Sequence, residues 1–373
     1  MIAAHNTLLP LLMNRSASHP LKLSIRTILV ATSLLAGSAV LAVATPRVMA
    51  AQLPPDSQPA SPPPPTTAPK AKKAAALTAT TPRVGAAPTA EGIVRARRDS
   101  LMDLKWPVKG PTPLPGAILP HQRIIAYYGN PLSKRMGVLG EYPSDQMLTM
   151  LDAEVAAWNK ADPSTPVVPA LHLVAVVAQG SAGGDGKYRA RMADTLVERV
   201  AAWAATRNAL VFLDVQVGLS TLPEELPRLE KFLMRPNFHL GIDPEFSMKH
   251  GGLPGKRIGT FDASDINYAT RFLAGIVDKY KLPPKVFVIH RFTQRGVTNY
   301  QNIKLDPAVQ IVMHMDGFGK PWLKRNTFRE YIKAEPVQFA GWKQFYKLRN
   351  DDPPTPIKEI LALNPKVVYV QYQ

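Results

Sequence analysis

Two carboxylic acids, Asp243 and Glu245, stand two residues apart where the apolar run 238-FHLGIDPEF ends. Residues two apart share a face of a strand, and their Cα atoms lie roughly 6–7 Å apart. Two carboxylates this close cannot both ionise freely, so the pKa of one of them is expected to rise. A carboxyl group that stays protonated can act as a general acid. The structural alternative is a carboxylate that pairs with an arginine or caps a loop.

Most other apolar runs of the chain also end in a polar or ionisable residue. The acids expected to be catalytic are Glu245, Asp243, Asp214 and Asp316. The residues expected to bind substrate are Tyr127, Tyr128, Gln179, Gln216, His290, His314, Lys343, Tyr346 and Gln371. Taken singly, each of them could serve the fold alone. A purely structural protein, however, would not need so many such residues at corresponding positions.

Eight apolar runs must position these side chains, and helix-like or polar segments separate the runs. The runs are 123-RIIAYYGN, 170-ALHLVAVVAQG, 209-ALVFLDVQVG, 238-FHLGIDPEF, 285-KVFVIHRF, 309-VQIVMHMDGFG, 337-VQFAGWKQFY and 366-KVVYVQYQ. Strands that alternate with helices predict an α/β fold with a parallel sheet. Eight strands in residues 121–373 predict closure into one (β/α)8 (TIM) barrel, whose strand ends meet at one mouth. A doubly wound open sheet is the alternative.

Apolar residues at helical spacing predict the helices between these runs. The predicted helices cover residues 145–159, 188–206, 222–233, 264–280, 323–332 and 356–363. The segment between Phe292 and Pro307 is short and poorly periodic, so an irregular crossover is expected there. Two Gly-rich stretches, 180-GSAGGDG and 250-HGGLPGKRIG, lack the spacing of a phosphate or dinucleotide loop.

The N-terminal third has the composition of an export signal and a tether. Residues 1–50 combine basic residues with the apolar stretch 28–44 and a small-residue cleavage site at 48–50, which predicts a signal peptide or an uncleaved membrane anchor. Residues 51–120 are rich in Pro and Ala and predict a disordered linker, with a short helix at 93–106. The barrel is therefore expected outside the cell, in the periplasm or at the cell envelope.

Composition limits both the kinds of site that the chain can form and the partners that it is expected to bind. The chain has no cysteine, which excludes disulfides, thiolate metal sites and a cysteine nucleophile. Its formal net charge of +17 favours anionic surroundings, such as an acidic polysaccharide, a cell wall or a membrane surface. The sequence has no cluster of basic and aromatic residues of the kind that binds nucleic acid, so no nucleic-acid partner is expected. We also expect a monomer that uses no cofactor. His290 and His314, together with the acids at the run ends, could bind a metal ion, so a metal site is an alternative. The first run, however, lacks a His-x-His pair.

The end of the fourth run resembles the strand-4 motif of glycosidase-type barrels, in particular the family 18 chitinase-like glycoside hydrolases. That motif ends in Asp-x-Glu, which Asp243 and Glu245 match. The resemblance implies that Glu245 is the acid and that Asp243 positions the N-acetyl group of a substrate.

Two further stretches are similar to that family, and two positions depart from it. Met313-His314-Met315-Asp316 is similar to its Met-x-Tyr-Asp on strand 6, with Met315 in place of Tyr, and 124-IIAYYG is similar to its first strand. Gly241 stands where the family has another Asp, and Ser-x-Gly-Gly at 181–184 follows the second run rather than the third. The sequence thus predicts an exported glycoside hydrolase-like enzyme that acts on an envelope or extracellular polysaccharide. A non-catalytic carbohydrate-binding barrel and a metal-dependent hydrolase are the alternatives.

Overall fold

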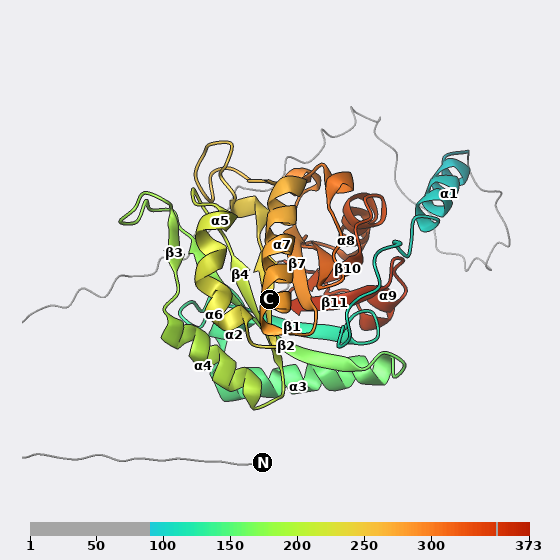
Figure 1. Ribbon diagram of the computed structural model, residues 1–373. Helices are drawn as coiled ribbons and strands as arrows, with labels where there is room; N and C mark the ends of the chain where they lie inside the picture. The colour runs from blue at the N-terminus through green and yellow to red at the C-terminus, as the bar shows by residue number, and fades with distance from the viewer. Residues whose placement is uncertain (1–89, 348–349) are drawn as a thin grey trace, which may run out of the picture. The chain divides into compact units, whose positions relative to one another are not determined.

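Eight parallel strands form a closed barrel in the computed structural model, which describes residues 90–347 and 350–373 (Figure 1). Neighbouring strands follow the order β1-β2-β4-β5-β7-β9-β10-β11, and β11 pairs with β1 to close the barrel. The strands are β1 Arg123–Gly129, β2 Val167–Ala178, β4 Leu210–Val215, β5 Phe238–Ile242, β7 Lys285–Arg291, β9 Val309–Met315, β10 Phe339–Gln344 and β11 Val367–Tyr372. The predicted (β/α)8 barrel is confirmed, whereas the predicted signal or anchor and most of the predicted linker lie outside the described residues.

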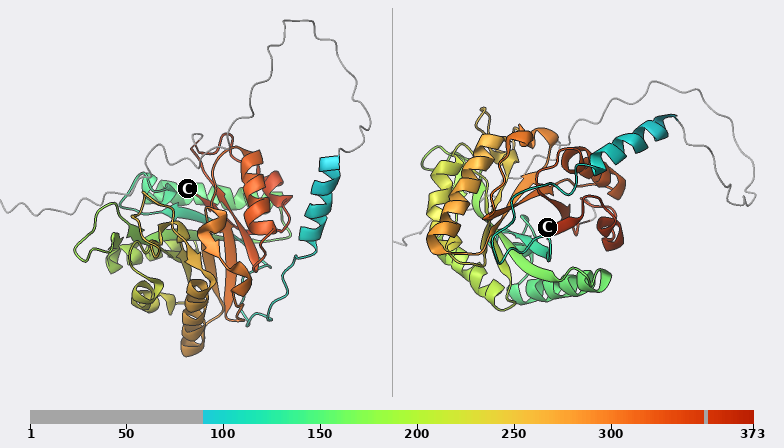
Figure 2. Two further views of the ribbon diagram at one scale, coloured as in Figure 1. Left: turned by 90° about the horizontal axis from the view of Figure 1, so that it is seen from above. Right: turned by 45° about the vertical axis from the view of Figure 1, so that its right-hand side comes forward.

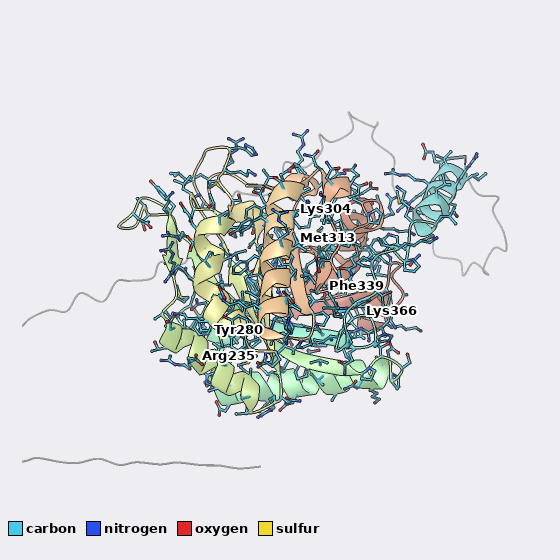
Figure 3. The ribbon with its side chains drawn as sticks, viewed as in Figure 1. Arg235, Tyr280, Lys304, Met313, Phe339 and Lys366 are labelled. Atoms are coloured by element: carbon cyan, nitrogen blue, oxygen red, sulfur yellow. The ribbon has the colours of Figure 1, made fainter. Side chains whose placement is uncertain are left out.

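Helices surround the strands in the views of Figures 1 and 2. They are α2 Val138–Glu141, α3 Ser144–Ala161, α4 Asp194–Ala205, α5 Leu222–Glu225, α6 Glu230–Leu233, α7 Ala263–Tyr280, α8 Pro321–Thr327 and α9 Ile357–Leu361. The 3-10 helix η1 Leu226–Leu229 joins α5 to α6, and α8 continues as the π-helix η5 Phe328–Lys333. Figure 3 labels Arg235 and Tyr280 at the lower end of the barrel, shortly before β5 and β7 begin. The upper end is therefore the mouth, where the strands end.

The predicted helix at 188–206 begins six residues late. Arg189–Arg191 instead forms the strand β3, antiparallel to the end of β2, and α4 begins only at Asp194. Arg189 and Arg191 each form an ion pair with the buried Glu225, at 2.7 Å. An extended segment places both arginines on one face, and a helix would separate them.

The crossover between β7 and β9 is irregular, as predicted. It contains the 3-10 helices η3 Gln294–Gly296 and η4 Tyr300–Asn302 and the two-residue strand β8 Val297–Thr298. Strand β8 pairs with β6 Phe261–Asp262, immediately before α7. The N-cap of α7 is Asp262, because its side chain accepts from the Ser264 N–H and the Asp265 side chain accepts from the Asp262 N–H.

Helix α1, Ala90–Asp103, lies before the barrel in the chain, within the segment expected to be a linker. Ion pairs join it to η5 at Arg98–Glu330 (3.0 Å) and Lys333–Asp103 (2.6 Å). No helix within residues 90–347 and 350–373 has the length and apolar character that a membrane span requires.

Leu119 plugs the lower end of the barrel. It is fully buried in a cluster of apolar residues that includes Ile124, Leu210 and Val286, each the first or second residue of its strand. The side chain of Gln310 fixes the plug, since its Oε1 accepts from the Leu119 N–H (3.1 Å) and its Nε2 donates to the Leu119 carbonyl (2.6 Å). The segment that precedes β1 therefore completes the barrel core.

Leu119→Ala should lower the free energy of unfolding by about 2–5 kcal/mol, because it leaves a cavity that the closed strands cannot fill. Urea unfolding of the full chain, followed by circular dichroism, measures this loss. Leu114→Ala is the matched control, because Leu114 lies on the same segment and is 40% exposed. Equal losses in the two variants would contradict the plug.

Candidate functional site

Polar and ionisable side chains from the strand ends converge at the upper end of the barrel. We call this group the mouth cluster; its members are Tyr128, Asp214, Gln216, Asp243, Glu245, His290, Asp316 and Lys343. They come from β1, β4, β5, β7, β9 and β10 or from the residue or turn that follows these strands. The convergence follows from barrel closure, which gathers residues from across the sequence at one mouth.

One side of the mouth cluster is a chain of hydrogen bonds between β1, β4 and β5. Gln216 Nε2 donates to Asp243 Oδ2 at 3.2 Å and lies 3.4 Å from the Tyr128 hydroxyl. The Tyr128 hydroxyl donates to Asp214 Oδ2 at 3.3 Å. Gln216 itself is held by the Ala178 N–H, which donates to its Oε1.

The other side of the cluster centres on Asp316. Lys343 Nζ lies 3.0 Å from Asp316 Oδ1, and His290 Nδ1 lies 2.9 Å from Asp316 Oδ2. Lys343 Nζ also sits 4.1 Å from the centroid of the Tyr128 ring, in cation–π contact. Burial raises the pKa of Asp316, but Lys343 and His290 outweigh it and hold that pKa well below its usual range.

The pKa values of Asp243 and Glu245 are both raised. Burial is the main cause for each, and neighbouring carboxylates add to it. The pKa of Glu245 rises to about 8, with Asp316 as the chief neighbouring acid. Glu245 is partly exposed, whereas Asp243 is buried. Two acids with raised pKa values thus lie near Asp316, which stays ionised. Such a difference in pKa allows one carboxyl group to donate a proton while another carries a negative charge.

The strand alternation used to relate Asp243 to Glu245 does not apply here. Strand β5 ends at Ile242, and Pro244–Phe246 forms the 3-10 helix η2. Pro244 cannot extend the hydrogen-bonded ladder, so the chain turns directly after Asp243. Glu245 therefore reaches the cluster from a turn.

Tyr127 and Tyr346, which the sequence predicts to bind substrate, lie outside the mouth cluster and contact each other instead. The Tyr127 hydroxyl bonds to the Tyr346 hydroxyl at 2.6 Å, and Tyr346 donates to Glu154 of α3. Side chains alternate along β1, so Tyr128 faces the barrel interior and Tyr127 faces the helices. Gln179 Nε2 donates to the Val177 carbonyl at 3.4 Å, and among the described residues no side-chain hydrogen bond joins Gln179 to the mouth cluster.

A layer of aromatic and polar residues lies beneath the cluster, and sequence reasoning found only part of it. His172, in the middle of β2, was missed; its Nδ1 lies 2.6 Å from the Tyr369 hydroxyl and 3.0 Å from Gln371 Nε2. His314 packs in the same interior, with its ring centroid 5.1 Å from that of His290. Burial lowers the pKa of His172 to about 4. A histidine inside an apolar run was the available signal.

A buried ion pair supports the loops beside Lys343. Lys324 pairs with Asp351, and Lys324 Nζ also donates to the Lys343 carbonyl at 2.7 Å. Asp351 accepts from the Phe345 N–H (3.0 Å) and the Gly319 N–H (3.2 Å). The loops after β9 and β10 are therefore tied to the strand that carries Lys343.

Aromatic rings line these loops. Phe318 stacks on Phe292, with ring centroids 6.0 Å apart, and meets Phe345 edge to face at 6.4 Å. Phe345 lies beside the cluster, since Lys343 Nζ is 5.6 Å from its centroid. Phe318 and the nearby Trp322 are exposed, by 37% and 62%.

Comparisons with known proteins identify no family. No protein-family model matches the chain, and no curated protein matches it. Among solved structures, the chain is similar to a ruminal GH26 endo-beta-1,4-mannanase, with a TM-score of 0.31 and 11% identity. The match covers 67% of this chain and 58% of that one, so it spans less than two thirds of the mannanase. The barrel assignment rests on the closed strand order and not on this similarity.

Lys343→Met should lower the free energy of unfolding by about 3–5 kcal/mol, because Asp316 would lose one partner of a buried ion pair. Urea unfolding near neutral pH measures the change. In Lys347→Met, the control, the replaced side chain is 41% exposed, and a change within about 0.5 kcal/mol is expected. A Lys343→Met protein as stable as the control would show that the pair contributes nothing.

Proposed function

We propose that the protein is a glycoside hydrolase and that Glu245 is its general acid. The observation that carries this proposal is a partly exposed carboxyl group at the mouth, with a pKa of about 8, beside an ionised acid. Below that pKa, Glu245 holds a proton that it can donate to the oxygen of a leaving sugar. A resemblance to family 18 at Asp243 and Glu245 supports the same role.

Asp316 is the charged partner in this proposal. Glycoside hydrolysis passes through an oxocarbenium-like transition state, which a second, ionised carboxylate stabilises. Lys343 and His290 hold Asp316 ionised, and it is 8% exposed, so one edge of it faces outward. Asp214 is fully buried and contacts Tyr128, which makes it a positioning residue.

A glycan fits the surroundings of Glu245. Sugar rings stack on exposed aromatic rings, and the partly exposed Phe318 contacts Phe345 beside Lys343 of the cluster. Exposed basic residues follow β5, β7 and β9 on the loops of the mouth; they are Lys249, Lys256, Arg257, Arg295 and Lys320. We therefore include anionic polysaccharides of the cell envelope among the substrates, in keeping with the export that residues 1–50 predict.

Glu245→Gln should lower hydrolysis on a polysaccharide panel by about 10²–10⁴-fold, because glutamine keeps the shape but donates no acidic proton. Release of reducing ends measures the rate. Glu359→Gln is the control, because Glu359 is a 47% exposed side chain on α9. Equal activity in wild type and Glu245→Gln would remove Glu245 from its role. Binding without products in both would favour a carbohydrate-binding protein.

The pH dependence of kcat/KM provides a separate test of the same acid. Glu245 must be protonated to act, so the rate should hold below pH 8 and fall about tenfold per pH unit above it. The kcat/KM of wild type, recorded from pH 6 to 10, measures this fall above pH 8. The kcat/KM of Glu245→Gln should not show the fall. A wild-type rate that stays level to pH 10 would contradict the assignment.

A further inference from the structure

Three polar atoms meet inside the barrel without a hydrogen-bond partner among the described residues; two belong to the mouth cluster and one to the layer beneath it. They are His172 Nε2, Asp214 Oδ1 and His290 Nε2. Their residues are buried, with exposed fractions of 0%, 0% and 1%, and the three atoms lie within 4.8 Å of one another. Burying polar atoms without partners costs free energy, so their convergence points to a missing ligand.

The separations of these atoms suit a shared metal ion better than direct hydrogen bonds. Asp214 Oδ1 lies 3.5 Å from His172 Nε2 and 3.6 Å from His290 Nε2. An N–H···O bond is typically 2.7–3.2 Å long, so both distances are too great. Two ligands of a tetrahedral zinc ion stand roughly 3.4 Å apart, given metal–ligand distances of about 2.0–2.2 Å.

Each of the three residues is oriented by a bond at its other polar atom. His172 Nδ1 contacts the Tyr369 hydroxyl at 2.6 Å, and His290 Nδ1 contacts Asp316 at 2.9 Å. Asp214 Oδ2 accepts from Tyr128. Metal-binding histidines usually bond their second nitrogen to a carboxylate or another oxygen in this way, which aims the free nitrogen at the ion.

Gly241 leaves room beside these atoms. A Cβ atom at this position would lie within 2.5 Å of both Asp214 Oδ1 and His172 Nε2. Any larger residue would therefore occupy the space between β5 and the two ligand atoms. Gly241 is also the place where the sequence departs from the family 18 pattern, so this departure opens the space.

We propose that His172, Asp214 and His290 bind one divalent first-row metal ion inside the barrel. Two imidazoles and one carboxylate form a donor set that suits zinc or ferrous iron and not magnesium or calcium. Three protein ligands leave a fourth position for a water molecule or another oxygen. His290, His314 and Asp316 also lie close together, but there His290 and Asp316 already bond each other. The main expectation from the sequence is a protein without metal or cofactor, and a metal site is its alternative; the proposed site follows that alternative.

Metal binding by the full, untagged chain tests this proposal. After chelator treatment and removal of the chelator, calorimetric titration should show one equivalent of Zn²⁺ bound, and a parallel anaerobic titration tests Fe²⁺. Mg²⁺ should give no binding. His172→Gln and His290→Gln should each weaken Zn²⁺ binding by at least about 100-fold, because each removes one of three ligands. Calorimetry without glycan separates this result from the proposed hydrolysis.

His239→Gln is the matched control. His239 is also a buried barrel histidine whose Nε2 lacks a partner among the described residues, but it lies outside the triad. This variant should keep the Zn²⁺ equivalent. The proposal would be overturned if wild type bound neither Zn²⁺ nor Fe²⁺. It would also be overturned if His172→Gln and His290→Gln both bound Zn²⁺ as tightly as wild type. If a variant fails to fold, anomalous scattering from metal-soaked wild-type crystals decides instead, and an ion away from these three atoms would refute it.

Discussion

Pairing of β1 with both β2 and β11 is the constraint on which the site depends. Closure of the barrel places the ends of eight strands around one axis. Because side chains alternate along each strand, each one points either into the barrel or toward the helices. On β1 this divides two adjacent tyrosines, since Tyr128 joins the cluster and Tyr127 joins the packing against α3. A shift of register by one residue would exchange them and dismantle the site.

Burial inside the closed barrel explains the electrostatics of the mouth. Water is largely excluded there, so an ionised group needs a partner, as Asp316 has in Lys343 and His290. At Asp243 and Glu245 the pKa rises instead, because burial outweighs the attraction of Lys343. The proposed general acid and the proposed metal ion thus have the same physical cause, the free-energy cost of burying polar groups away from water.

Residues outside the mouth cluster hold its strands and loops in place. Leu119 closes the lower end, and the Lys324–Asp351 pair ties the loops after β9 and β10 to the strand of Lys343. Such contacts keep reacting groups in place, because a side chain is positioned only as firmly as the residues behind it.

Local pattern in the sequence determined the eight strands, most of the helices and the irregular crossover, because alternation and helical spacing record which faces are buried. It also marked the acids and His290 at the strand ends, since the mouth of a parallel barrel lies there. Only the tertiary structure decided between Tyr127 and Tyr128, brought His172 to Asp214 and His290, and placed Glu245 on a turn. Those outcomes depend on register and on contacts between distant strands, which no local pattern contains.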